Sequence, residues 1–226
     1  METASKSPSD EPKSSTEPAA VEAGQEAGID AEKLAKLERS LVRKLDRNML
    51  PILFLMYFMN YIDRNALPHA RLDTLEEDLG LHGWDYNVSI SVFFIGYLLM
   101  QIPSNMLITK VRPSRYLSGC MLAWASLSGV TAAVREGKGL ATCRFFLGFV
   151  EAPFYPGALY LLSSFYTREE LGVRIALMYM GQILSSGLAG LFAAGIFKTL
   201  HNTLGLSGWR WLFIIEASVT AAIALL

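Results

Sequence analysis

Two ionisable residues stand inside an otherwise apolar stretch of the chain. Arg144 and Glu151 lie seven positions apart in the run CRFFLGFVEAPFYP, residues 143–156. That spacing is nearly two helical turns, so both side chains point to one side of a helix, and Gly148 between them is expected to leave space there. Ionisable groups at membrane depth are costly and normally face a bundle interior or a water-filled cavity. We therefore interpret the stretch as a candidate functional site that the remaining elements must position.

The composition indicates a membrane protein. Of the 226 residues, 52% are hydrophobic and only 18% are charged, and the apolar residues gather in long runs. Soluble domains carry more charge. The net charge of −1 gives no reason to expect a nucleic-acid partner. Cys120 and Cys143 both fall in apolar runs, so we expect neither a disulfide framework nor a cysteine-rich metal site.

Six apolar runs are each close to the roughly 20 residues that cross a bilayer as a helix. We expect them at about 49–68, 87–109, 116–134, 140–162, 173–197 and 209–226. The predicted fold class is therefore all-α, with residues 49–226 forming a six-helix transmembrane bundle. The last run is still apolar at Leu226, from which we expect the sequence to be a fragment or a domain cut at its middle.

Two further segments precede the predicted bundle. Residues 1–30 are rich in small, polar and charged residues, and we expect a disordered tail because they cannot bury enough surface to offset the entropy of ordering. Residues 31–48 show leucines at helical spacing opposite a basic face, which predicts an amphipathic lead-in helix. Such a helix lies on an anionic inner leaflet or is solvated and helps to set the topology, and the sequence leaves both interpretations open.

Basic residues in the short links predict the orientation. They are concentrated before the first span, between spans two and three, and between spans four and five, whereas the alternate links hold fewer. Because such residues remain on the cytoplasmic side, the N-terminus is predicted to be cytoplasmic.

A helical rise of ~1.5 Å per residue then gives each polar group in a span a depth. Asn60, Tyr97, Glu151 and Gln182 converge on a central layer, with Gln101 deeper along its helix. A carboxylate near the midplane has no short route to water. Glu151 is therefore expected to be protonated, paired with Arg144, or exposed to a cavity.

Asp63 and Arg144 share an outer layer. Less specific interpretations remain for these groups. Asp63 and Arg64 could simply end the first span, and the long side chain of Arg144 could reach outward to the interface. Asn60 and Tyr97 could merely hydrogen-bond neighbouring helices.

Prolines and glycines predict local features of the spans. Pro103 in span two, and Pro153 and Pro156 in span four, are expected to break or kink their helices. Span five carries glycines, with serines and alanines between them, that form a small-residue surface on which another helix can pack closely: Gly181, Gly187, Gly190 and Gly195.

Motifs of soluble enzymes are absent from the sequence. It contains no G-x-x-x-x-G-K-[ST], no G-x-G-x-x-G after a strand and no H-E-x-x-H, and its three histidines have no ligand spacing. We therefore expect no enzyme activity, no metal site and no cofactor.

Several short motifs occur together in order. They are RKLD at 43–46, NYIDRN at 60–65, DLGL at 78–81, YLLMQIPSN at 97–105, RPSR at 112–115, the 144–156 stretch and GWRWLFIIE at 208–216. In this order they closely resemble the major facilitator superfamily, and within it the fungal anion:cation symporter group of allantoate and nicotinate permeases. One departure is that residues 105–115 contain no acid, where the superfamily normally has an aspartate.

The resemblance implies a twelve-span plasma-membrane carrier made of two six-span halves that works by alternating access. Its substrates would be small organic anions, such as vitamins or nitrogen sources, taken up with protons. The chain would then be the N-terminal half, and its partner would be a second six-span half or a second copy.

On this hypothesis Arg144 attracts the anion, and Glu151 and Asp63 carry or sense the proton. Asn60, Tyr97, Gln101 and Gln182 shape the binding site. The alternative hypothesis is a membrane protein that does not transport: a truncated paralogue, a sensor or a partner subunit that retains the half-fold.

Overall fold

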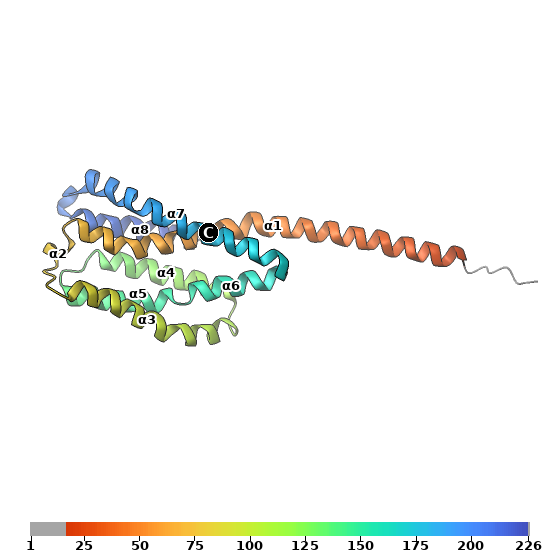
Figure 1. The fold of residues 1–226 in the computed structure, drawn as a ribbon, viewed down its shortest axis with the longest axis horizontal. Helices are drawn as coiled ribbons and strands as arrows, with labels where there is room; N and C mark the ends of the chain where they lie inside the picture. Colours follow the sequence, from red (N-terminus) through yellow and green to blue (C-terminus); the bar gives the residue numbers. More distant parts are fainter. Residues whose placement is uncertain (1–16, 226) are drawn as a thin grey trace, which may run out of the picture. The chain divides into compact units, whose positions relative to one another are not determined.

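The computed structural model describes residues 17–225, with side chains from Lys33 onward except at Ala35. The helices in chain order are α1 (Glu17–Leu72), α2 (Leu75–Asp78), α3 (Asp85–Ile108), α4 (Pro113–Thr131), α5 (Gly137–Glu151), α6 (Phe154–Phe165), α7 (Arg168–Leu200) and α8 (Gly208–Ala224), with a 3₁₀ turn at Thr203–Gly205 (Figure 1). No strand occurs in the described residues. The predicted all-α class is confirmed.

The chain divides into two compact units, Met1–Leu45 and Asp46–Leu226. In the first unit, residues 1–16 of the predicted tail lie outside the described residues, and the backbone is helical from Glu17. The predicted lead-in helix at 31–48 therefore falls within a longer helix. Its leucines Leu34, Leu37 and Leu41 are exposed.

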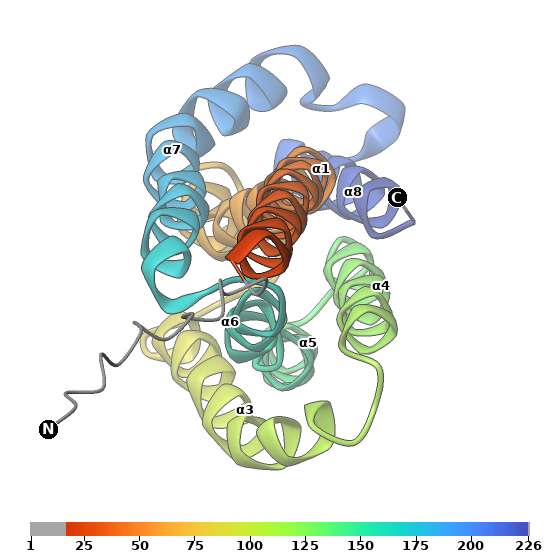
Figure 2. The same ribbon diagram turned by 90° about the vertical axis from the view of Figure 1, so that its right-hand side faces the viewer.

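The second unit is a helical bundle. Within it α3 packs along α5, α4 packs against α5 and α8, and α7 packs against α6 and α8 (Figure 2). In the part of the chain that the structure describes, three helical segments are long and apolar enough to cross a membrane: Asp85–Ile108, Gly137–Phe165 and Arg168–Leu200. Helices also form at the three other predicted spans, as the later part of α1, as α4 and as α8.

The fourth predicted span is interrupted. α5 ends at Glu151 and α6 begins at Phe154, so the break falls at Ala152 and Pro153. Proline has no backbone N–H and its ring clashes with the preceding turn, which accounts for the position of the break. Pro103 behaves differently, because α3 continues through it.

Two glycines bring the backbones of α3 and α5 together. A Cβ added to Gly148 would lie 2.1 Å from the carbonyl oxygen of Phe93, and one added to Gly96 would lie 2.2 Å from that of Phe145. Real Cβ atoms do not approach so closely. The space expected beside the charges at Gly148 is therefore filled by the backbone of α3.

The small-residue surface of α7 packs only in part. A Cβ at Gly181 would lie 3.0 Å from the carbonyl oxygen of Phe54 on α1, and one at Gly190 would contact His69. Gly187 and Gly195 have nothing within 4 Å of that position. Gly181 and Gly190 therefore face α1, whereas Gly187 and Gly195 face open space.

Acidic side chains fasten α8 to the segment after α1. Asp73 accepts a hydrogen bond from the backbone N–H of Trp209 at 3.0 Å, and Asp78 accepts one from the Trp209 indole at 2.8 Å. Ser207 also donates to Asp78. Partial burial raises the pKa of Asp78, but the donors Ser207, Trp209 and Thr74 outweigh it and leave the pKa below its ordinary value.

Another contact joins the beginnings of α7 and of the bundle part of α1. Arg174 donates from Nε and Nη2 to the two carboxylate oxygens of Asp46, each at 2.8 Å. Its guanidinium lies 4.0 Å from the centre of the Tyr166 ring. The hydrogen bond from Arg174 is the main cause that lowers the pKa of Asp46, and burial raises the pKa of Tyr166 to about 12.

The α3–α5 contact gives a stability prediction. Gly148→Ala forces a methyl group against the Phe93 carbonyl, and overpacking of this kind costs about 1–3 kcal/mol. We expect a clear fall in the melting temperature of the purified protein in detergent. Gly187→Ala is the matched control, because its methyl group meets open space and alanine favours a helix. Equal melting temperatures for the two variants would contradict the close approach.

The Asp78 contact gives a pH prediction. Because its pKa is lower in the folded state, the contact stabilises the fold above the ordinary aspartate pKa of 3.8, and the stabilisation is lost as pH falls through the lower folded value. Asp78→Asn should therefore show a smaller loss of melting temperature between pH 6 and pH 3 than the unmodified protein. Glu77→Gln, at an exposed neighbouring acid, serves as the control and should leave that loss unchanged.

Candidate functional site

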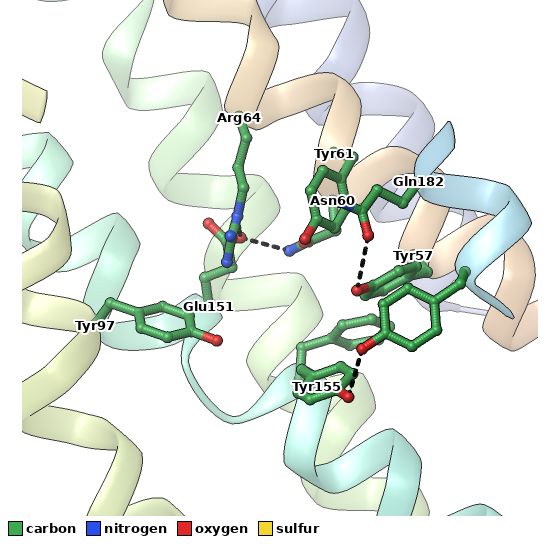
Figure 3. Close-up of a pocket in the computed structure, with 10 residues that line it drawn as sticks. Tyr57, Asn60, Tyr61, Arg64, Tyr97, Glu151, Tyr155 and Gln182 are labelled. Atoms are coloured by element: carbon green, nitrogen blue, oxygen red, sulfur yellow. Dashed lines mark hydrogen bonds and ion pairs between the residues drawn. The ribbon is translucent and has the colours of Figure 1, made fainter. Parts of the chain in front are cut away.

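A cavity of about 250 Å³ lies among five helices of the bundle. Its lining side chains come from α1, α3, α5, α6 and α7, and most are aromatic or polar (Figure 3). They are Tyr57, Asn60, Tyr61, Arg64, Tyr97, Glu151, Phe154, Tyr155, Tyr179 and Gln182.

One face of α1 supplies a large share of this lining. Tyr57, Asn60, Tyr61 and Arg64 follow one another at steps of three, one and three residues, so they fall on two adjacent turns of one helix face. The helix thereby presents two rings, an amide and a guanidinium to the same space.

Glu151 is the charged centre of the cavity. It is the last residue of α5 and is 2% exposed. Its Oε1 accepts a hydrogen bond from Asn60 Nδ2 at 2.8 Å and a second from Arg64 Nε. Oε2 has no hydrogen-bond partner among the described residues. The carboxylate is therefore only half satisfied by protein groups.

Arg64 balances this charge from the cavity side. Its side chain is 26% exposed, against 0% for the side chain of Glu151. The guanidinium carbon lies 5.3 Å from the centre of the Tyr61 ring and 5.1 Å from that of Tyr97, within the range of a cation–π contact. Rings and carboxylate together hold the guanidinium at the cavity wall.

Tyrosine hydroxyls occupy the other side of the cavity. The hydroxyl oxygens of Tyr155 on α6 and Tyr179 on α7 lie 2.6 Å apart, and the hydroxyl of Tyr57 donates to Gln182 Oε1 at 3.5 Å (Figure 3). The cavity thus joins one ion pair to a group of uncharged hydrogen-bonding side chains.

Most of the residues predicted to share a central layer lie around this cavity. Asn60, Tyr97, Glu151 and Gln182 all line the cavity. Gln101 does not, although it lies one turn further along α3 than Tyr97. The roles that the sequence assigned to these residues stay predictions.

Asp63 lies elsewhere. Its carboxylate is buried and accepts hydrogen bonds from the Trp124 indole at 2.8 Å and from Ser128 Oγ at 2.6 Å. Both donors are on α4. Asp63 therefore links α1 to α4 and does not line the cavity, so it does not simply end a span at the surface.

Arg144 occupies a separate buried position. It is 3% exposed, its guanidinium lies 5.4 Å from the centre of the Phe213 ring, and Nε and Nη2 have no hydrogen-bond partner in the described part of the chain. It interacts electrostatically with Asp63, Glu151 and Glu216. Burial of the side chain does not fit the interpretation in which it reaches outward to the interface.

A second cavity connects the two arginines. It measures about 120 Å³, and Arg64 and Arg144 both line it amid apolar side chains. Arg64 thus borders both cavities, whereas Arg144 borders only the smaller one.

Sequence reasoning missed Arg64 as the partner of Glu151. It considered Arg144 for that place and treated Arg64 as the end of a span. The sequence did indicate that Arg64 lies near Glu151, because Arg64 follows Asn60 by one turn and so shares its helix face. The same spacing would have found Tyr57 and Tyr61.

The described residues hold no group of three or more histidine, cysteine, aspartate or glutamate side chains placed to bind a metal ion.

Residues 53–226 match the sequence profile of the Major Facilitator Superfamily. The chain belongs to this superfamily, which makes it a multi-pass membrane protein of a transporter family and not an enzyme.

Curated relatives agree with this assignment. The chain is 37% identical over 188 residues to the MFS-type transporter efuF of Hormonema carpetanum, covering 83% of this chain and 38% of that protein. It is 36% identical to the major facilitator-type transporter hxnP of Emericella nidulans, over 84% of this chain and 39% of that protein. It is 35% identical to the pantothenate transporter FEN2 of Saccharomyces cerevisiae, over 85% of this chain and 38% of that protein. The chain therefore spans about two fifths of the length of these relatives.

A solved structure shares the fold. The bacterial homolog of the human lysosomal transporter Spinster, in an inward-facing and unoccupied conformation, matches with a TM-score of 0.66 and 22% identity. The match covers 78% of this chain and 41% of that one. This likeness supports the predicted six-helix half of a major facilitator fold.

The Arg64–Glu151 pair gives a prediction on stability. Removing one partner of a buried ion pair leaves an uncompensated charge, which costs about 3–5 kcal/mol when burial is complete and less here because Arg64 is partly exposed. We expect Arg64→Gln and Glu151→Gln each to lower the melting temperature, and the double variant to lose less than the sum. Strict additivity in this double-mutant cycle would contradict a direct pair.

Proposed function

We propose that this chain forms the N-terminal half of a carrier that moves a small organic anion together with protons by alternating access. The observation that carries the proposal is the ion pair between Arg64 and Glu151 at the wall of the cavity. A transporter needs a site that attracts its cargo and a group whose charge can change, and this pair can supply both.

Arg64 is the proposed anion-binding group. Its partly exposed guanidinium can form charge-assisted, bidentate hydrogen bonds with a carboxylate that enters the cavity. Asn60, Gln182 and the tyrosine hydroxyls would bind the polar parts of the cargo. A carboxylic acid such as nicotinate, pantothenate or allantoate has this chemistry, and one relative is named as a pantothenate transporter.

Glu151 is the proposed proton carrier. When a substrate carboxylate takes over the guanidinium of Arg64, Glu151 is left buried with only Asn60 as a donor. An unpaired buried carboxylate is costly, so it binds a proton. Anion binding and proton uptake are thereby coupled through one arginine.

The other residues of the hypothesis take supporting roles. Arg144, unpaired and close to the smaller cavity, contributes positive potential that attracts the anion. Asp63 balances the charge of Arg144. It is the second proposed proton-coupling group. Gln101 contacts cargo only if the site extends further along α3.

The topology belongs to the same proposal. The N-terminus lies in the cytoplasm and the protein resides in the plasma membrane, as the basic links and the symporter resemblance imply. A second six-span half, or a second copy, completes the cavity.

Uptake of anions tests the role of Arg64. In proteoliposomes that contain the full-length carrier, Arg64→Gln should raise the apparent KM for the anion by about tenfold or more, because a charge-assisted bond worth roughly 1.5–3 kcal/mol is lost. Nicotinate, allantoate, pantothenate and biotin form the substrate panel. Arg71→Gln, at an exposed arginine outside the cavity, is the control. A KM unchanged in Arg64→Gln would disprove the assignment, and a larger effect in Arg144→Gln would return the role to Arg144.

Accumulation tests the role of Glu151. Glu151→Gln should retain exchange of labelled for unlabelled anion but lose accumulation driven by a pH gradient, because glutamine cannot bind the proton. Exchange in the same vesicles controls for folding. Accumulation with the pH dependence of the unmodified protein would rule out proton coupling through Glu151.

A further inference from the structure

A groove near the end of α5 shares no lining residue with the proposed transport site. It measures about 320 Å³ and lies among α3, α4, α5 and the start of α6. Val150 and Pro153 line it, whereas their neighbour Glu151 lines the cavity at Arg64. The two sites therefore lie on different faces of the chain at the end of α5.

Apolar and small side chains form most of this groove. Met100, Phe149 and Val150 supply apolar walls, and Gly119 and Ala123 of α4 lie one turn apart in the lining. A Cβ added to Gly119 would have nothing within 4 Å. A hydrocarbon chain can therefore lie along α4 at this point without displacing protein atoms.

One end of the groove is basic. Arg115 lines it at the first turn of α4. In the part of the chain that the structure describes, Arg115 and its neighbours Lys110 and Arg112 form no ion pair, and residues 105–115 contain no acid. The positive charge at this end is therefore available to an anionic ligand.

A hydrogen bond links one lining residue of the groove to α3. Tyr116, next to Arg115, donates its hydroxyl to Ser104 Oγ on α3 at 3.0 Å. This contact ties the start of α4, which carries Arg115, to α3, which carries Met100.

We propose that this groove binds one anionic phospholipid. An acyl chain lies along Gly119 and Ala123 beside Phe149, and the headgroup, whose net charge is negative, binds Arg115, with Lys110 and Arg112 adding attraction. Basic pockets between membrane helices on the cytoplasmic side suit such headgroups, and the inner leaflet carries the anionic lipids. The apolar walls of the groove suit an acyl chain, and Arg115, which forms no ion pair, suits an anionic headgroup.

Native mass spectrometry of the full-length carrier in detergent tests this site. Phosphatidylserine should form a one-to-one adduct at about tenfold lower concentration than phosphatidylcholine, which is the discrimination expected of one charge-assisted contact. Arg115→Gln should reduce this preference, because only the attraction of Lys110 and Arg112 remains. Gly119→Leu should weaken the binding of both lipids by filling the groove, and Gly187→Leu, at an open position on α7, should not.

A second readout needs no variant. Cys120 lines the groove, so bound phosphatidylserine should slow its labelling by a small apolar maleimide, measured on the peptide that contains it. Phosphatidylcholine at the same concentration should slow it less. Equal binding of the two lipids, a preference that Arg115→Gln leaves unchanged, or equal effects of Gly119→Leu and Gly187→Leu would each overturn the proposal.

Discussion

Glu151 can be buried in its charged form in this bundle because α1 brings a cation to it. An isolated carboxylate in an apolar interior is strongly disfavoured, and the guanidinium of Arg64 and the amide of Asn60 compensate it from one face of one helix. This requirement fixes the rotation of α1 against the end of α5. The tyrosines that share the α1 face are thereby turned into the same cavity, so the shape of the site follows from the need to pair one charge.

The position of Glu151 depends in turn on two backbone features of the fourth predicted span. Gly148 and Gly96 let α5 approach α3 to direct backbone contact, which leaves one side of α5 facing the interior beside α1. Pro153 then ends the helix just after the glutamate. Because the chain restarts as α6, Tyr155 can approach Tyr179 of α7. The two charged residues of this stretch therefore differ in surroundings. Glu151 ends α5 at the larger cavity, and Arg144 is buried mainly among apolar side chains beside the smaller one.

Much of this arrangement follows from periodicity and depth. Apolar runs predicted the helices, and a constant rise per residue brought Asn60, Tyr97, Glu151 and Gln182 to one level, where the structure has them around one cavity. Depth along a helix does not give rotation about its axis, however. Arg64 and Arg144 both lie near Glu151, and only the packing of α1 against α5 decides which of them it pairs with. Likewise, the glycine pattern of α7 does not say which face of that helix packs against another helix.

The adjacent residues Asp63 and Arg64 contact different parts of the bundle because they project from α1 in different directions. Asp63 bonds to the α4 side chains Trp124 and Ser128, while Arg64 borders the cavity. Side chains on the cavity face can therefore diverge among descendants of one ancestral gene while the α4-facing contacts remain intact. On the proposed function, changes at Tyr57 or Tyr61 alter the cargo without disturbing the contacts that hold α1 to α4.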